Sequence, residues 1–74
     1  MVKDKESKFK ELAEKRVNKA ISLIRLVGNL SNINNYDYTQ DQANKICSSL
    51  ENEVRNMKAK FKAEMSKNNA KFKL

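Results

Sequence analysis

The sequence predicts an all-α protein, in which two helices form an antiparallel hairpin and two hairpins pair into a four-helix bundle. Three observations support this. Proline is absent and glycine occurs once, and these two residues are the strongest interruptions of regular structure. Apolar residues recur at three- and four-residue steps in two long segments, as on one face of a helix. A single short segment, polar and rich in asparagine, separates the two.

The first predicted helix covers about residues 4–30. Asp4 and Glu6 place negative charge where the helix dipole favours it, and Glu6 precedes Lys10 by four residues, a spacing that supports an ion pair. The apolar face comprises Phe9, Leu12, Ala13, Val17, Ala20, Ile21, Ile24 and Val27, and it is widened by Leu23, Leu26 and Leu30. An apolar surface this wide has to be covered on more than one side.

Gly28 has two interpretations. It ends the first helix in a left-handed conformation, or it lies inside the last turn, where it lets another backbone approach. The apolar spacing continues to Leu30 and favours the second. The connector, residues 31–38, is polar, and its asparagines suit turns. Its length is typical of a helical hairpin.

The second predicted helix covers about residues 39–66 and is followed by a basic tail, 67–74. Thr39 and Gln42 match the capping box that starts many helices. The apolar face comprises Ala43, Ile46, Cys47, Leu50, Val54, Met57, Phe61 and Met65. We expect Cys47 to lie in the core as a small apolar residue.

The length of the chain indicates that it assembles with something. Seventy-four residues form one domain, and a domain this small has a marginal core unless it is reinforced. One cysteine excludes an internal disulfide, and the absence of histidine removes the usual zinc ligands. Oligomerisation or binding to a larger partner is the remaining route. We expect a homodimer, and we expect no metal and no cofactor.

Positive charge is concentrated at the C-terminal end. Residues 1–16 carry a net charge of +2, residues 17–54 of −1 and residues 55–74 of +6. The bases of the last segment are Arg55, Lys58, Lys60, Lys62, Lys67, Lys71 and Lys73, against Glu64 alone. Lysine-rich surfaces bind phosphate backbones through counterion release. We expect these seven residues to bind DNA or RNA; a solvated helix face and contact with a membrane surface are the alternatives.

A second group of residues is suited to binding a partner. It comprises Arg25, Leu26, Leu30, Asn32, Asn35, Tyr36 and Tyr38. Exposed tyrosines stack on bases or anchor protein interfaces. Structural roles are the alternative: the asparagines would form turns, Tyr38 would act as a hydrophobic staple, and Arg25 would pair with Glu51 or Glu53.

Nothing in the sequence predicts catalysis. A chain with no histidine and one cysteine offers no nucleophile–base pair, and it has no glycine-rich phosphate loop. No apolar run is long enough to span a bilayer, and the first residues do not resemble a signal peptide. We therefore expect a non-enzymatic cytoplasmic protein.

Residues 16–39 resemble small helical proteins encoded by Gram-positive phages, plasmids and other mobile genetic elements. The matching residues are Arg16, Asn18, Lys19, Ala20, Ile24, Arg25, Leu26, Gly28, Asn29, Leu30, Ser31, Asn32, Asn35, Tyr36, Tyr38 and Thr39. The resemblance implies that the protein is encoded by a mobile genetic element, and it implies no particular activity.

Two functions follow from the sequence, and a purely structural subunit of a helical bundle is the third hypothesis. The first is that of a small basic accessory or regulatory protein, which binds nucleic acid or a nucleoprotein complex through its second helix. The alternative is an inhibitor or adaptor from a mobile element. It would act on a host enzyme or defence complex through the apolar surface of the first helix and the connector.

Overall fold

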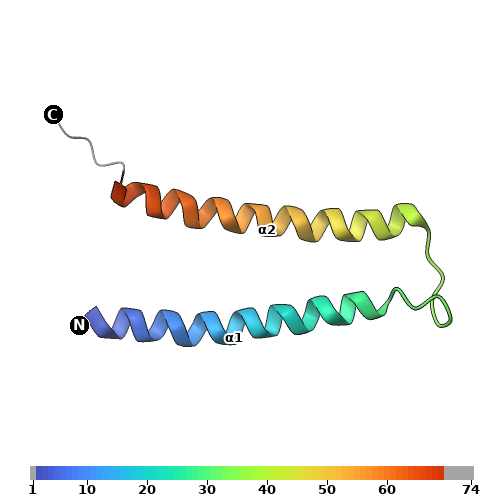
Figure 1. Ribbon diagram of the computed structural model, residues 1–74, viewed down its shortest axis with the longest axis horizontal. Helices are drawn as coiled ribbons and strands as arrows, with labels where there is room; N and C mark the ends of the chain where they lie inside the picture. The colour runs from blue at the N-terminus through green and yellow to red at the C-terminus, as the bar shows by residue number, and fades with distance from the viewer. Residues whose placement is uncertain (1, 70–74) are drawn as a thin grey trace. The chain divides into compact units, whose positions relative to one another are not determined.

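The predicted all-α class is confirmed. The computed structural model describes residues 2–69, and side chains over residues 4–67. It contains two helices, α1 (Val2–Asn29) and α2 (Gln40–Asn69), with no strand in the described part (Figure 1). Two helices about one short connector are consistent with a helical hairpin. The four-helix bundle stays a prediction.

The chain divides between Tyr38 and Thr39 into two compact units. In the first unit, α1 runs without interruption, and Lys10 Nζ lies 3.7 Å from a carboxylate oxygen of Glu6. Both side chains of this pair are well exposed, so the pair contributes only a few tenths of a kcal/mol. The length of α1 follows from its sequence, which has no proline and no glycine before Gly28.

Gly28 lies inside the last turn of α1. No residue of the described chain has a positive φ, so the left-handed ending is excluded. The helix closes instead with tight turns, because the Leu30 and Ser31 amides donate to the carbonyls of Val27 (3.0 Å) and Gly28 (3.1 Å). A Cβ at Gly28 would meet no atom within 4 Å. The single chain therefore gives no packing reason for glycine here.

Asn32 organises the connector. Its side-chain Oδ1 accepts a hydrogen bond from the Asn34 amide at 3.0 Å. Its carbonyl accepts two more, from the amides of Asn35 (3.1 Å) and Tyr36 (3.0 Å). An asparagine that bonds its own backbone two residues on is a recurrent turn device. The predicted turn role of Asn32 is therefore seen in atomic detail.

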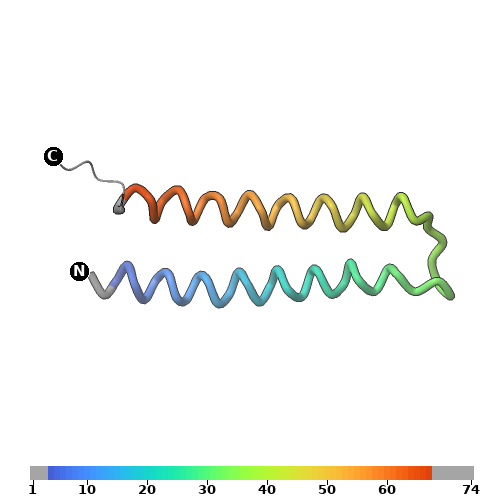
Figure 2. Tube along the Cα trace, turned by 45° about the horizontal axis from the view of Figure 1, so that its top comes forward, coloured from blue at the N-terminus to red at the C-terminus, as the bar shows by residue number. Residues whose placement is uncertain are grey.

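Tyr38 closes the connector. Its hydroxyl donates to the carbonyl of Ser31 at 2.7 Å, which ties the two ends of the segment together. Figure 2 traces the connector as a loop between α1 and α2. A short surface loop with tied ends and its own internal hydrogen bonds is held in a defined shape. Tyr38 thus has a structural role through its hydroxyl group.

The second unit begins with the predicted capping box. Thr39 Oγ1 accepts from the Gln42 amide at 3.1 Å, and Gln42 Oε1 accepts from the Thr39 amide at 2.9 Å. Two amide groups without an intrahelical partner are thereby satisfied at once. The helix then runs to Asn69, beyond the predicted end near residue 66. Lys67 and Glu64, 3.0 Å apart, lie within its last two turns.

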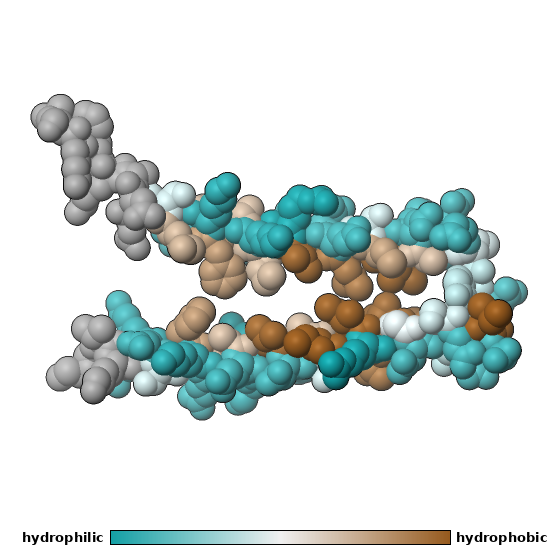
Figure 3. All heavy atoms as spheres, in the orientation of Figure 1, coloured by the Kyte–Doolittle hydropathy of each residue, from teal (hydrophilic) through white to brown (hydrophobic). Residues whose placement is uncertain are grey.

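Apolar residues gather along one side of each helix (Figure 3), yet none is buried within residues 4–67. Leu26 on α1 is 60% exposed and Phe61 on α2 is 53% exposed. Cys47, predicted to lie in the core, is also exposed. Its position on the apolar side of α2 is as predicted, but its burial would require a covering surface that this single chain does not supply.

Candidate nucleic-acid interface

Five of the seven predicted nucleic-acid-binding residues lie on the described part of α2. They are Arg55, Lys58, Lys60, Lys62 and Lys67, and all five are exposed. We call them the basic surface. Lys71 and Lys73 lie outside the described residues. Along 55–67 the only acid is Glu64, so the local charge balance strongly favours an anionic partner.

The basic side chains differ in their contacts. Arg55 Nη1 donates to Asn52 Oδ1 at 2.7 Å, and Lys67 Nζ donates to Glu64 Oε2 at 3.0 Å. Among the described residues, Lys58, Lys60 and Lys62 have no hydrogen-bond or ion-pair partner. Their ammonium groups are therefore hydrated and available to a phosphate, at little cost in broken protein contacts.

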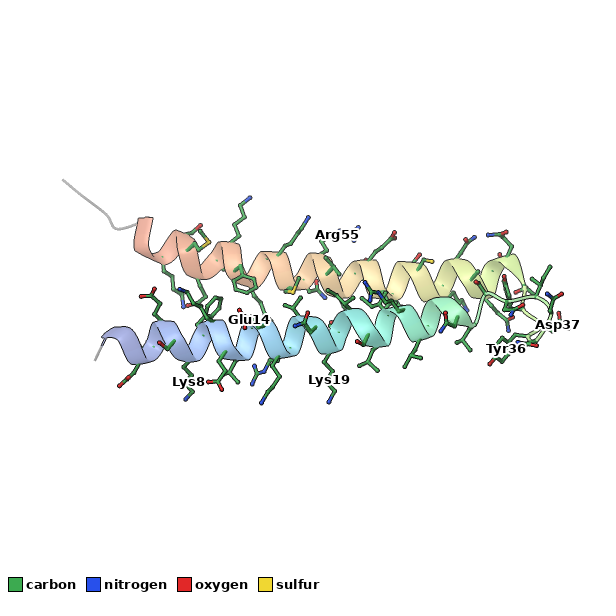
Figure 4. All side chains as sticks on the ribbon, turned by 60° about the horizontal axis from the view of Figure 1, so that its bottom comes forward. Lys8, Glu14, Lys19, Tyr36, Asp37 and Arg55 are labelled. Atoms are coloured by element: carbon green, nitrogen blue, oxygen red, sulfur yellow. The ribbon has the colours of Figure 1, made fainter. Side chains whose placement is uncertain are left out.

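The hydrogen bond between Arg55 and Asn52 leaves most of the donors of Arg55 available. A guanidinium group carries five N–H donors, and the hydrogen bond to Asn52 uses one. The residues are three positions apart on α2, so the contact fixes the arginine against its own helix. Figure 4 shows the Arg55 side chain extending from the α2 ribbon. The remaining donors can form the bidentate contacts that arginine makes with phosphate.

The basic surface has two sides. Residues of an α-helix turn by about 100° each, so Arg55, Lys58 and Lys62 share one side of α2, and Lys60 and Lys67 share another. The apolar stripe of α2, formed by Val54, Met57, Phe61 and Met65, lies between Lys58 and Lys60. The basic residues therefore flank the stripe without interrupting it.

The predicted partner-binding residues lie in the first unit, on α1 and the connector. Arg25, Leu26 and Leu30 are exposed, and Tyr36 is half exposed. Figure 4 shows Tyr36 and Asp37 side by side at the connector. Asn32 uses its side chain within the turn. The predicted pairing of Arg25 with Glu51 or Glu53 stays a prediction.

Asn35 and Tyr38 have structural contacts in the same segment. Asn35 donates its backbone amide to the turn and keeps an exposed side chain. The Tyr38 hydroxyl is engaged with Ser31, and 38% of the residue remains exposed. The Tyr36 ring and the side-chain amide of Asn35 are therefore more accessible to a partner than the Tyr38 side chain is.

Ile33 is a residue that sequence reasoning missed. It is 78% exposed, more than any other large apolar residue of the described chain. It lies in the turn between Asn32 and Asn34, where polar residues predominate. The sequence did contain a signal for this residue. Ile33 is an apolar, β-branched residue within an asparagine-rich turn, and neither turn formation nor helix packing requires such a residue there.

Two other kinds of feature are absent from the described residues. No group of three or more Cys, Asp or Glu residues within them could hold a metal ion. Neither helix, over its described length, has a stretch long and apolar enough to cross a bilayer. Comparison with protein-family models, curated proteins and solved structures finds no match to this chain. The resemblance of residues 16–39 to proteins of mobile elements therefore stays a prediction.

Proposed function

We propose that this protein is a small, non-enzymatic accessory protein that binds nucleic acid through the basic surface of α2. The observation that carries the proposal is the state of Lys58, Lys60 and Lys62. All three are exposed, no partner holds them among the described residues, and the one acid nearby is held by Lys67. Such a surface gains free energy by releasing the counterions condensed on a phosphate backbone.

We further propose that two copies of the chain pair through their apolar surfaces. Val54 is 42% exposed and Phe61 is 53% exposed on α2, and Leu23 is 53% exposed on α1. Burial of such surface contributes about 25 cal/mol per Å², which a chain of this size needs for a stable fold. Because the basic residues flank the apolar stripe, pairing leaves them accessible.

Equilibrium binding of nuclease-treated protein to fluorescently labelled DNA and RNA tests the nucleic-acid proposal. We expect micromolar or tighter binding at about 50 mM salt, with the electrostatic term dominating. The informative variant replaces Lys58, Lys60 and Lys62 with glutamine, which keeps the length and helix propensity of the side chains close to those of lysine. It should weaken binding by tenfold or more.

A matched variant controls for net charge. Lys8, Lys15 and Lys19 lie on one side of α1, and Figure 4 shows Lys8 and Lys19 projecting in the same direction. Replacing these three with glutamine lowers the net charge by the same amount, from +7 to +4. A weaker effect than that of the α2 variant locates binding on α2. Equal effects, or no binding by the unaltered protein, would refute the proposal.

A second candidate function, an inhibitor or adaptor that binds a protein, is favoured by the first unit. Leu26 is 60% exposed, Ile33 78% and Tyr36 50%, and the hydrogen bonds of the connector hold the last two in a defined loop. Pre-organised aromatic and aliphatic anchors are typical of the residues that dominate protein interfaces. In this case a complex with a purified partner protein would persist in high salt. Leu26→Asp or Tyr36→Ala would disrupt it without changing the oligomeric state.

A further inference from the structure

The basic residues of α2 border a second surface, on the side of the helix opposite the apolar stripe. At about 100° per residue, five residues between positions 52 and 66 fall on this side, and we call them the outer face. They are Asn52, Asn56, Ala59, Ala63 and Ser66, all exposed. None is charged, and none has a side chain larger than asparagine. The outer face is therefore neutral and close to the helix backbone.

Basic residues stand on both sides of the outer face. Arg55 and Lys62 are seven residues apart on one edge, and Lys60 and Lys67 are seven residues apart on the other. Each pair spans about 10 Å along the axis, and the two edges are separated by roughly 140° around it. The Arg55–Asn52 hydrogen bond, at 2.7 Å, ties the guanidinium to the outer face. The basic residues thus form two rows, with the uncharged outer face of the helix between them.

Two rows of phosphates border each groove of a duplex. The major groove of B-form DNA is about 12 Å wide and admits an α-helix, whose diameter with side chains is about 10–12 Å. Small residues on the side of the helix that enters the groove let the helix approach the nucleobases. The basic residues that flank this side can then reach the phosphates on both walls of the groove. Asparagine on such a side can bond the edge of adenine.

Resting on the proposed function, we propose that α2 enters the major groove of B-form duplex DNA with its outer face. Arg55 and Lys62 lie against one phosphate wall, and Lys60 and Lys67 against the other. Duplex RNA is a poor substitute, because its major groove is deep and narrow. A single strand has no second wall. The opposite side of α2, which carries the apolar stripe, stays free for assembly.

The substrate class is tested with three labelled oligonucleotides of one sequence: duplex DNA, duplex RNA and single-stranded DNA. We expect duplex DNA to bind at least tenfold more tightly than the other two. A DNA duplex with bulky groups on C5 of its pyrimidines, which project into the major groove, should bind as weakly as duplex RNA. Equal binding of all four would overturn the inference and leave the proposed function standing.

A steric variant tests which side of α2 enters the groove. Ala63→Leu keeps the charge and the helix propensity but adds bulk to the outer face. We expect it to weaken duplex DNA binding by about tenfold and to leave the helix content and the oligomeric state unchanged. Ser48→Leu is the matched control, since Ser48 lies on the same side of α2 but before Arg55, the first residue of the basic surface.

The outcomes separate the two proposals. Loss of affinity in Ala63→Leu but not in Ser48→Leu supports groove entry. Unchanged affinity of Ala63→Leu, with binding still lost when Lys58, Lys60 and Lys62 are replaced, overturns groove entry and retains the basic surface. No binding to any of the oligonucleotides overturns both.

Discussion

The capping box at the start of α2 allows a quantitative prediction for Thr39→Ala. This change removes the Oγ1 atom that accepts the Gln42 amide at 3.1 Å, while the bond from the Thr39 amide to Gln42 Oε1, at 2.9 Å, can persist. Loss of such a cap costs about 1 kcal/mol, within a range of roughly 0.5–2. Because Thr39 is exposed, water replaces part of the lost bond, and we expect a value near 1.

The assay is urea unfolding followed by far-ultraviolet circular dichroism at one fixed protein concentration, because the stability of a dimer depends on concentration. Thr39→Ala should lower the free energy of unfolding by about 1 kcal/mol, equivalent to roughly 4–8 °C in Tm. Thr39→Ser keeps the accepting oxygen and is the matched control. If the alanine and serine variants were equally stable, the bond to Thr39 Oγ1 would contribute nothing to the stability of the protein.

Three further predictions concern single positions. Gly28→Ala should raise the free energy of unfolding by about 1 kcal/mol, because a Cβ there meets nothing within 4 Å; a loss of stability in thermal unfolding would mean that a partner backbone occupies that space. Tyr38→Phe removes the hydroxyl that donates to Ser31 at 2.7 Å. It should cost about 0.5–1 kcal/mol and speed amide hydrogen exchange in the connector, whereas unchanged exchange would contradict a closing role for this bond. Cys47 is exposed in the single chain, so its reaction with a thiol reagent should slow as rising protein concentration drives pairing. A rate independent of concentration would exclude burial of this face by a second copy.

Helix identity was predictable because the signals were local. The spacing of apolar residues, the lack of proline and the Thr39–Gln42 pair each act within a few residues, and all three give the observed elements. The extension of α2 to Asn69 was missed because the low helix propensity of asparagine is a small term. The Glu64–Lys67 pair at 3.0 Å opposes it in the same turns.

The connector and the sites were less predictable. The bond from Tyr38 to Ser31 joins residues seven apart through a hydroxyl group, and no periodicity reports such a contact. The exposure of Ile33 depends on the turn that Asn32 organises. The basic surface was predictable, because the net charge of a segment is read directly from its sequence. Its two edges and the uncharged outer face follow from helical spacing, and the structure supplies the condition they need, a continuous α2 through residues 52–67.

The salt dependence of binding tests the central claim most directly. The logarithm of the association constant for duplex DNA, plotted against the logarithm of salt concentration, has a slope of about −0.9 per phosphate neutralised. Replacing Lys58, Lys60 and Lys62 with glutamine should therefore make the slope shallower by about 2.7 per chain. The same replacement of Lys8, Lys15 and Lys19 should change it little. A slope that is unaltered by the α2 variant, or altered equally by both, would contradict binding through the basic surface.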